Sequence, residues 1–142
     1  MADMDRIRES AYKAGKQLYK TLPILLGAIM LVSIADTLIP KQVYAGVFSL
    51  SPAANSVIGA ALGSVLAGNP VTSYVIGGEF LDQGVSLVAV TAFLIAWVTV
   101  GVIQIPAEAM LLGKRFTAIR NISAFLFAII SAFLTVAVIC AL

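Results

Sequence analysis

Residues 63–80 read GSVLAGNPVTSYVIGGEF, and this stretch decides how the chain folds. Apolar residues flank it on both sides, yet Gly68, Asn69 and Pro70 stand together at its centre. Glycine favours turns and proline lacks a backbone donor, so a helix is expected to break here. Residues 54–81 therefore either cross a membrane as one kinked helix or enter it and return as a hairpin.

The composition indicates that the chain lies in a membrane. The chain of 142 residues is 61% hydrophobic and 11% charged, whereas soluble domains contain about 25% charged residues. Its mean hydropathy is +1.03. A chain of this size cannot cover so much apolar surface in water, so we expect an all-α integral membrane protein.

Several functional classes are excluded by what the chain lacks. It has one cysteine, Cys140, and no histidine, so neither an intrachain disulfide nor a Cys/His metal site can form. The commonest general base is also missing. The net charge of +2 is small and does not suggest nucleic acid as a partner. We expect no enzymatic activity, no catalytic residues, no metal and no cofactor.

Residues 1–20 combine an apolar and a basic helical face. The apolar face comprises Ile7, Ala11, Ala14 and Leu18, and the basic face comprises Arg6, Lys13, Lys16 and Lys20. This spacing predicts an amphipathic helix lying on the membrane surface. The alternative is a solvated tail.

Three segments are predicted to be transmembrane helices: residues 21–40, 84–106 and 122–142. About 20 apolar residues are needed to cross a hydrocarbon core of about 30 Å. Pro23 falls in the first turn of the first span, where a missing N–H costs little, and Pro40 is expected to end that span. Pro106 is a possible kink in the second, and residues 113–121 are predicted to be a polar loop.

The two parts of residues 54–81 are each too short to cross. Ser51 before Pro52, and Asn69 before Pro70, each match a helix cap followed by a first helical residue. The helices that follow would be about 15 and about 11 residues long, or about 22 Å and about 17 Å.

The distribution of basic residues favours the hairpin. Lys and Arg near span ends gather on the cytoplasmic side. Three spans plus a re-entrant hairpin place eight of the nine basic residues on one side, whereas four spans divide them five against four. We therefore expect a multi-pass plasma-membrane protein with a cytoplasmic N-terminus and an external C-terminus. The eight are Arg6, Arg8, Lys13, Lys16, Lys20, Lys114, Arg115 and Arg120, and Lys41 is the ninth.

The predicted binding site is the hairpin tip. The helix that begins at Pro70 would offer exposed N–H groups at residues 71–73, which attract anions, and unwound carbonyls before it could hold cations. The alternative is that Asn69 only caps the second helix. The candidate substrate- or ion-binding residues here are Gly68, Asn69, Pro70, Thr72 and Ser73.

Two further polar residues are candidates for the same site. Asp36 lies near the outer end of the first predicted span, where it could reach the interface or face a cavity. Gln104 precedes Pro106 and Glu108, so it could line the inner mouth of a pathway or belong to a solvated helix end. Ionisable residues within a membrane are usually functional.

Residues 50–105 resemble one repeat of the predicted-permease superfamily that includes the arsenical efflux permeases. The segment GAALGSVLAGNPVTSYVIGGEFLDQGVSLVAVTAFLIAW carries the resemblance. Nucleoside-recognition gate domains are a secondary resemblance. Full-length members of the superfamily are similar to two such repeats fused in one chain, and this chain holds one. The arsenical permeases carry cysteines in a hairpin, and this hairpin has none.

The resemblance implies a half-size permease subunit that moves a small solute or ion past the hairpin tip. A half-unit needs a partner, either a second copy of the chain in a homodimer or a separate, oppositely oriented half-transporter, together with membrane lipid. The alternative is a non-transporting subunit that assembles with a partner through the faces of Gly59 and Gly63.

Overall fold

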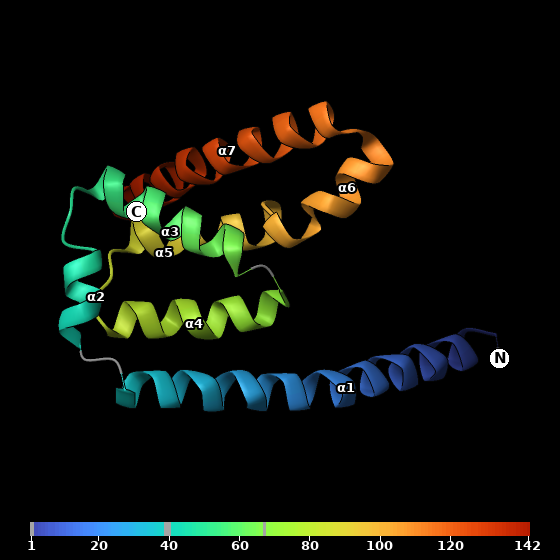
Figure 1. The fold of residues 1–142 in the computed structure, drawn as a ribbon. Coiled ribbons are helices and arrows are strands. Elements are labelled where there is room, and N and C mark those ends of the chain that lie inside the picture. The colour runs from blue at the N-terminus through green and yellow to red at the C-terminus, as the bar shows by residue number, and fades with distance from the viewer. Residues whose placement is uncertain (1, 39–40, 67) are drawn as a thin grey trace.

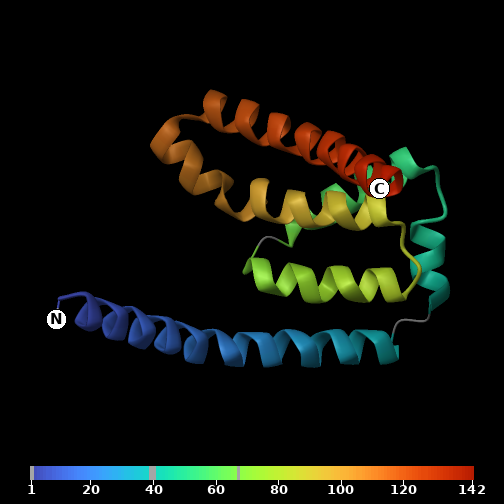
Figure 2. The same ribbon diagram turned by 180° about the vertical axis from the view of Figure 1, so that it is seen from behind.

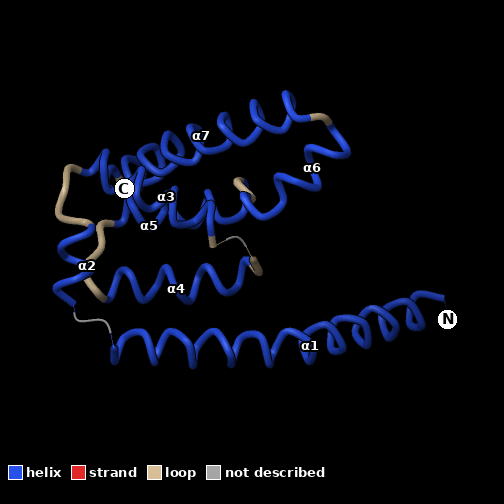
Figure 3. Tube along the Cα trace, viewed as in Figure 1, coloured by secondary structure: helices blue, strands red, loops and turns tan. Residues whose placement is uncertain are grey.

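The computed structural model describes residues 2–38, 41–66 and 68–142, and in these ranges the chain is helical with short connections (Figure 3). The all-α prediction is confirmed for this part of the chain. The elements are α1 (Ala2–Leu38), α2 (Lys41–Val47), α3 (Pro52–Val65), α4 (Pro70–Asp82), α5 (Leu87–Thr99), η1 (Val102–Gln104), α6 (Ile105–Leu112) and α7 (Lys114–Ala141).

Small residues let α3 pack directly against the backbone of α5. A Cβ atom built on Gly59 would lie 2.2 Å from the carbonyl oxygen of Ala89, and one built on Gly63 would lie 2.3 Å from that of Phe93. Only glycine permits such contacts, as in membrane helix pairs with small residues at their interface. Gly59 and Gly63 therefore pack against α5 of the same chain.

The core lies along α5, between α3 and α7. Its fully buried side chains on these three helices are mostly alanines, so the helix axes approach closely. The alanines are Ala60, Ala92, Ala96, Ala128 and Ala132. On another side of α5, α4 packs through Gly77, whose built Cβ would lie 3.1 Å from Leu94 Cδ2.

The chain reverses direction between α3 and α4. Both ribbon views show these helices running in opposite directions, with the connection at the end of the bundle that also holds the end of α5 (Figures 1 and 2). They have 14 and 13 residues, or about 21 Å and about 20 Å. The predicted helix break between residues 65 and 70 is confirmed.

The predicted caps explain where these two helices begin. The hydroxyl oxygen of Ser51 accepts a hydrogen bond from the N–H of Ala54 at 3.4 Å, with Pro52 as the first helical residue of α3. Asn69 serves α4 in the same way, and Pro70 follows it. Short polar side chains at these positions satisfy backbone donors that a helix start leaves unpaired.

The predicted division between residues 20 and 21 is wrong, because α1 is one continuous helix of 37 residues with Pro23 in its interior. Proline removes one backbone hydrogen bond, but strong helix formers lie on both sides of it, including Leu22 before it and Leu26 after it. The predicted end at Pro40 lies outside the described residues.

The predicted continuous helix over residues 84–106 is also wrong. α5 ends at Thr99, and Val100 is extended, with φ −113° and ψ 106°. Gly101 follows before η1 and α6. The break therefore precedes the predicted kink at Pro106, which instead lies in the first turn of α6.

The predicted polar loop at residues 113–121 reduces to a turn at Gly113. Its φ of 88° lies in the left-handed region, where glycine is favoured. Helix α7 starts at the next residue, so the final helix begins eight residues before the predicted Ile122. The sharp turn lays α7 back along α5 and α6 (Figure 1).

Two segments of the described chain are long and apolar enough to cross a membrane. They are Leu87–Leu112, with mean hydropathy 2.2, and Lys114–Ala141, with mean hydropathy 2.7. Only 11% of the tested window in the second segment is buried within the chain. An apolar helix exposed to this extent indicates a membrane protein rather than a soluble core helix.

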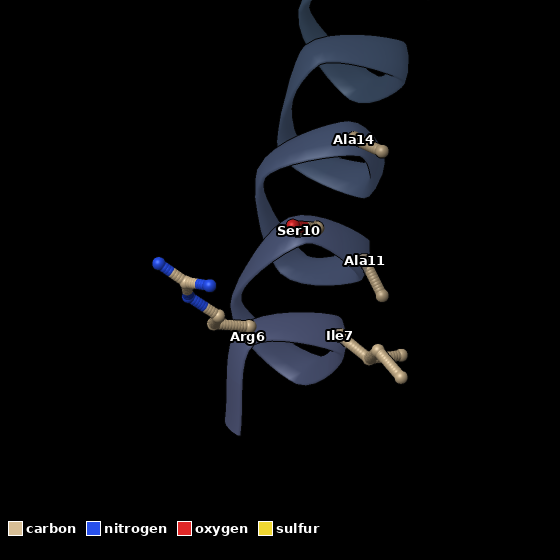
Figure 4. Close-up of a pocket in the computed structure, with 5 residues that line it drawn as sticks. All are labelled: Arg6, Ile7, Ser10, Ala11 and Ala14. Atoms are coloured by element: carbon tan, nitrogen blue, oxygen red, sulfur yellow. The ribbon is translucent and has the colours of Figure 1, made fainter. Parts of the chain in front are cut away.

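The N-terminal turns of α1 project away from the other helices, at the same end of the molecule as the α6–α7 turn (Figure 1). Their side chains from Arg6 to Lys20 are exposed. In Figure 4, Ile7, Ala11 and Ala14 lie along one side of the helix and Arg6 extends from the other. This surface belongs to a single helix and encloses no site.

Candidate functional site at the turn between α3 and α4

The turn between α3 and α4 brings together five of the predicted site residues. Gly68 and Pro70 are exposed, Asn69 and Thr72 are half-buried, and Ser73 is buried. We use the name tip for Gly68–Asn69–Pro70 together with the first turn of α4. The tip is thus a short polar segment held between two helices that both pack on α5.

Asn69 caps α4, as the sequence predicted. Its Oδ1 accepts a hydrogen bond from the N–H of Val71 at 2.9 Å, and its backbone oxygen accepts one from the N–H of Thr72 at 3.0 Å. The prediction of exposed N–H groups at residues 71 and 72 is therefore wrong. Because the cap uses Oδ1, the amide nitrogen of Asn69 is the part of the side chain left for another acceptor.

Ser73 also turns back onto the tip. Its hydroxyl donates to the carbonyl oxygen of Pro70 at 2.6 Å, and the residue is 1% exposed. The hydroxyl oxygen keeps its acceptor lone pairs, but its proton is committed to the helix. Ser73 therefore fixes the shape of the first turn of α4, which positions Thr72 one residue earlier.

Trp97, which the sequence interpretation missed, lies beside the tip. A Cβ built on Gly68 would lie 3.5 Å from Cζ2 of Trp97. The indole is 6% exposed and contacts Phe93 edge-on, with ring centroids 5.4 Å apart. Its Nε1 is buried and has no hydrogen-bond partner in the described part of the chain. Tryptophan N–H groups usually find a partner when buried, so this donor is unusual.

A second helix break lies next to the first. α5 ends at Thr99, and its extension through Gly101 into η1 contacts α3. α3 and α5 run in the same direction, so their carbonyl ends finish side by side (Figures 1 and 2). Carbonyl ends carry partial negative charge, and the N-terminus of α4 carries partial positive charge.

Gln104 is exposed in η1 and folds over the adjacent glycine. A Cβ built on Gly101 would lie 2.9 Å from Gln104 Oε1. Its helix adjoins α3, so Gln104 belongs to the end of the bundle that holds the tip. Within the described chain, Gln104 forms no hydrogen bond with a tip residue.

Asp36 is not brought to the tip. It lies near the C-terminal end of α1, and its side chain is outside the described part of the chain. The neighbouring turns of α1, at Ile29 and Ser33, share a groove with residues of α4 from Tyr74 to Asp82. The C-terminal end of α1, which contains Asp36, lies beside the end of α4 that is farther from the tip (Figure 1).

A polar network that the sequence interpretation did not predict joins α6 to α7. Glu108 forms an ion pair and hydrogen bond with Arg120, and it accepts a hydrogen bond from Asn121 Nδ2 at 3.2 Å. The Glu108 side chain is 18% exposed. Glu108 therefore links α6 to the start of α7.

Asn121 also lines an apolar groove of about 380 Å³ that runs past the end of α3. Its Nδ2 also donates to the carbonyl of Thr117 at 3.0 Å, which leaves Oδ1 buried and without a partner in the described chain. The other lining residues are Ala61, Ser64, Val65, Val100, Val102, Ile122, Phe125 and Leu126.

Comparison of the chain with protein-family models, with curated proteins and with solved structures gave no match. The features that bear on function are therefore those of the site itself: a polar tip, two adjacent helix ends, and one buried indole donor.

Proposed function

We propose that the chain is a half-size membrane permease subunit that oligomerises and moves a small solute or ion past the tip. Transport then proceeds without covalent chemistry, through gating around the tip. The observation that carries the proposal is the reversal between α3 and α4, whose 14 and 13 residues are each too few to cross a bilayer. Irregular backbone within a membrane is tolerated where protein or a watery cavity surrounds it, which is how discontinuous helices form transport sites.

The proposed topology has three spans, namely the second half of α1, the α5–α6 segment and α7, with α3 and α4 as the re-entrant hairpin. The N-terminus and the α6–α7 turn lie at one end of the molecule, and α2 lies at the other (Figure 1). With eight of nine basic residues at the first end, the rule for cytoplasmic positive charge favours a cytoplasmic N-terminus and an external C-terminus at the plasma membrane.

A partner is part of the proposal because one chain leaves the tip incompletely covered. Gly68 and Pro70 are exposed, and such a backbone needs protein or water around it at membrane depth. The proposed partner is a second copy or a separate, oppositely oriented half. The alternative function is a non-transporting assembly subunit. Since Gly59 and Gly63 already pack against α5, such a subunit would have to bind its partner through another surface.

Replacing Asn69 with serine separates the capping role from the proposed solute-binding role. Serine is also a good helix cap, but it lacks the amide donor of Asn69. We expect Asn69→Ser to keep stability within about 0.5 kcal/mol and to lower solute flux about tenfold, the cost of one lost hydrogen bond. Flux is measured by light scattering from proteoliposomes challenged separately with N-methylacetamide, glycerol and sodium sulfate.

The matched control is Ser51→Ala, which removes the cap of α3 at the end of the hairpin far from the tip. It should cost about 1 kcal/mol of stability and leave flux per folded protein unchanged. If no oligomer, alone or with a co-purified partner, moves any of the three solutes, the permease proposal is wrong and the assembly role is favoured.

A further inference from the structure

We infer that Trp97 is a solute-binding residue of the tip and that the solute is an uncharged polar molecule carrying a hydrogen-bond acceptor. This inference rests on the proposed function and adds to it a binding residue and a substrate class. Its starting point is the buried Nε1 of Trp97, which has no partner within the described chain.

The unpaired N–H lies on the edge of the indole that faces the tip. Cζ2 and Nε1 are both bonded to Cε2, so they lie on the same edge of the ring. Cζ2 is the atom nearest to a Cβ built on Gly68, at 3.5 Å. The contacts of Trp97 with Phe93 and of Phe93 with Phe80, at centroid distances of 5.4 Å and 5.2 Å, hold the ring in this orientation.

The other groups at the tip also offer donors. Asn69 has committed Oδ1 to the N–H of Val71, which leaves its two amide protons available, and the hydroxyl of Thr72 lies on the same turn. The N-terminus of α4 adds partial positive charge. Leaving a buried donor unpaired destabilises the protein, so a ligand that supplies an acceptor oxygen to Trp97 would remove that destabilisation.

The absence of charged side chains in the sequence argues for a neutral ligand. No charged residue occurs between Lys41 and Glu79, or between Asp82 and Glu108, and these two segments supply the tip and Trp97. A full ionic charge held in a membrane without a counter-charge is costly. The adjacent carbonyl ends of α3 and α5 also oppose an anion. A carbonyl or similar neutral acceptor meets both conditions.

The chain has a single tryptophan, so its indole N–H gives one cross-peak in a nitrogen–proton NMR spectrum of the labelled full-length protein in nanodiscs. The probes are N-methylacetamide, sodium sulfate, and sodium chloride at matched ionic strength. N-methylacetamide should move the cross-peak downfield in a saturable manner. Asn69→Ser should weaken the apparent affinity about tenfold, as expected for one lost hydrogen bond.

The control variant is Thr91→Val, which removes a hydroxyl bonded to Leu87 O on α5, toward the other end of that helix. It should leave the titration unchanged. A peak that no probe moves would overturn the assignment of Trp97, and a peak moved by sulfate at lower concentration than by N-methylacetamide would overturn the neutral class. Neither result bears on the flux measurement, so the permease proposal is judged separately.

Discussion

Gly63→Ala is expected to lower the free energy of unfolding by about 3 kcal/mol or more, which is the upper part of the range for an overpacked core. The added methyl group would lie 2.3 Å from the carbonyl oxygen of Phe93 and 3.0 Å from the N–H nitrogen of Trp97. Both neighbours are backbone atoms, so no side-chain rotation can relieve the clash. α3 must instead move away from α5. Thermal unfolding in detergent, followed by size-exclusion chromatography, measures the loss.

Gly78→Ala is the matched control, because it makes the same substitution in a neighbouring helix. Gly78 lies inside α4, and nothing lies within 4 Å of a Cβ built on it. Alanine should therefore stabilise the protein by about 0.5–1 kcal/mol through its helix propensity. Equal stability of the two variants would contradict the close packing of α3 on α5.

Membrane-impermeant thiol labelling should give an all-or-none pattern across the membrane. The positions are Tyr12, Asp82 and Phe116, which are all exposed, each changed to cysteine in a background that carries Cys140→Ser. With three spans and a re-entrant hairpin, Asp82→Cys should be labelled in intact cells. Tyr12→Cys and Phe116→Cys should be labelled only after permeabilisation, since their surroundings hold the basic residues.

The pair Tyr12 and Phe116 decides between the two topologies. If residues 54–81 formed a fourth span, these two positions would lie on opposite sides of the membrane. Labelling of either one alone in intact cells would therefore contradict the three-span arrangement. Labelling of both but not of Asp82→Cys would reverse the orientation while leaving the hairpin intact.

The helix caps made much of the hairpin predictable from sequence. Ser51 before Pro52 and Asn69 before Pro70 are local signals, and the structure starts α3 and α4 at those prolines. Local signals were misleading at Pro23, because a proline in the interior of a helix looks like one in its first turn. They also failed at Gly101, where the break in the apolar run was assigned to Pro106.

The surroundings of the tip could not be predicted because they depend on which helices pack together. The position of Trp97 beside Gly68 follows from the contact of α3 with α5, and an apolar run gives no register for that contact. The Glu108–Arg120 pair depends in the same way on the turn at Gly113. Sequence reasoning identified Asn69 as either a cap or a ligand, and the structure demonstrates the cap.

The proposed site requires the chain to reverse direction at the tip, and one distance measures that reversal. Spin labels at Val57 and Leu81, which are 46% and 42% exposed, can be measured by pulsed electron resonance in nanodiscs. The background carries Cys140→Ala, and unlabelled protein is added in excess to remove distances between subunits. Two helices packed on the same third helix lie within about 20 Å of each other, so we expect a distribution centred below about 25 Å. A distribution centred near about 36 Å, the length of a continuous helix over those 24 steps, would contradict it.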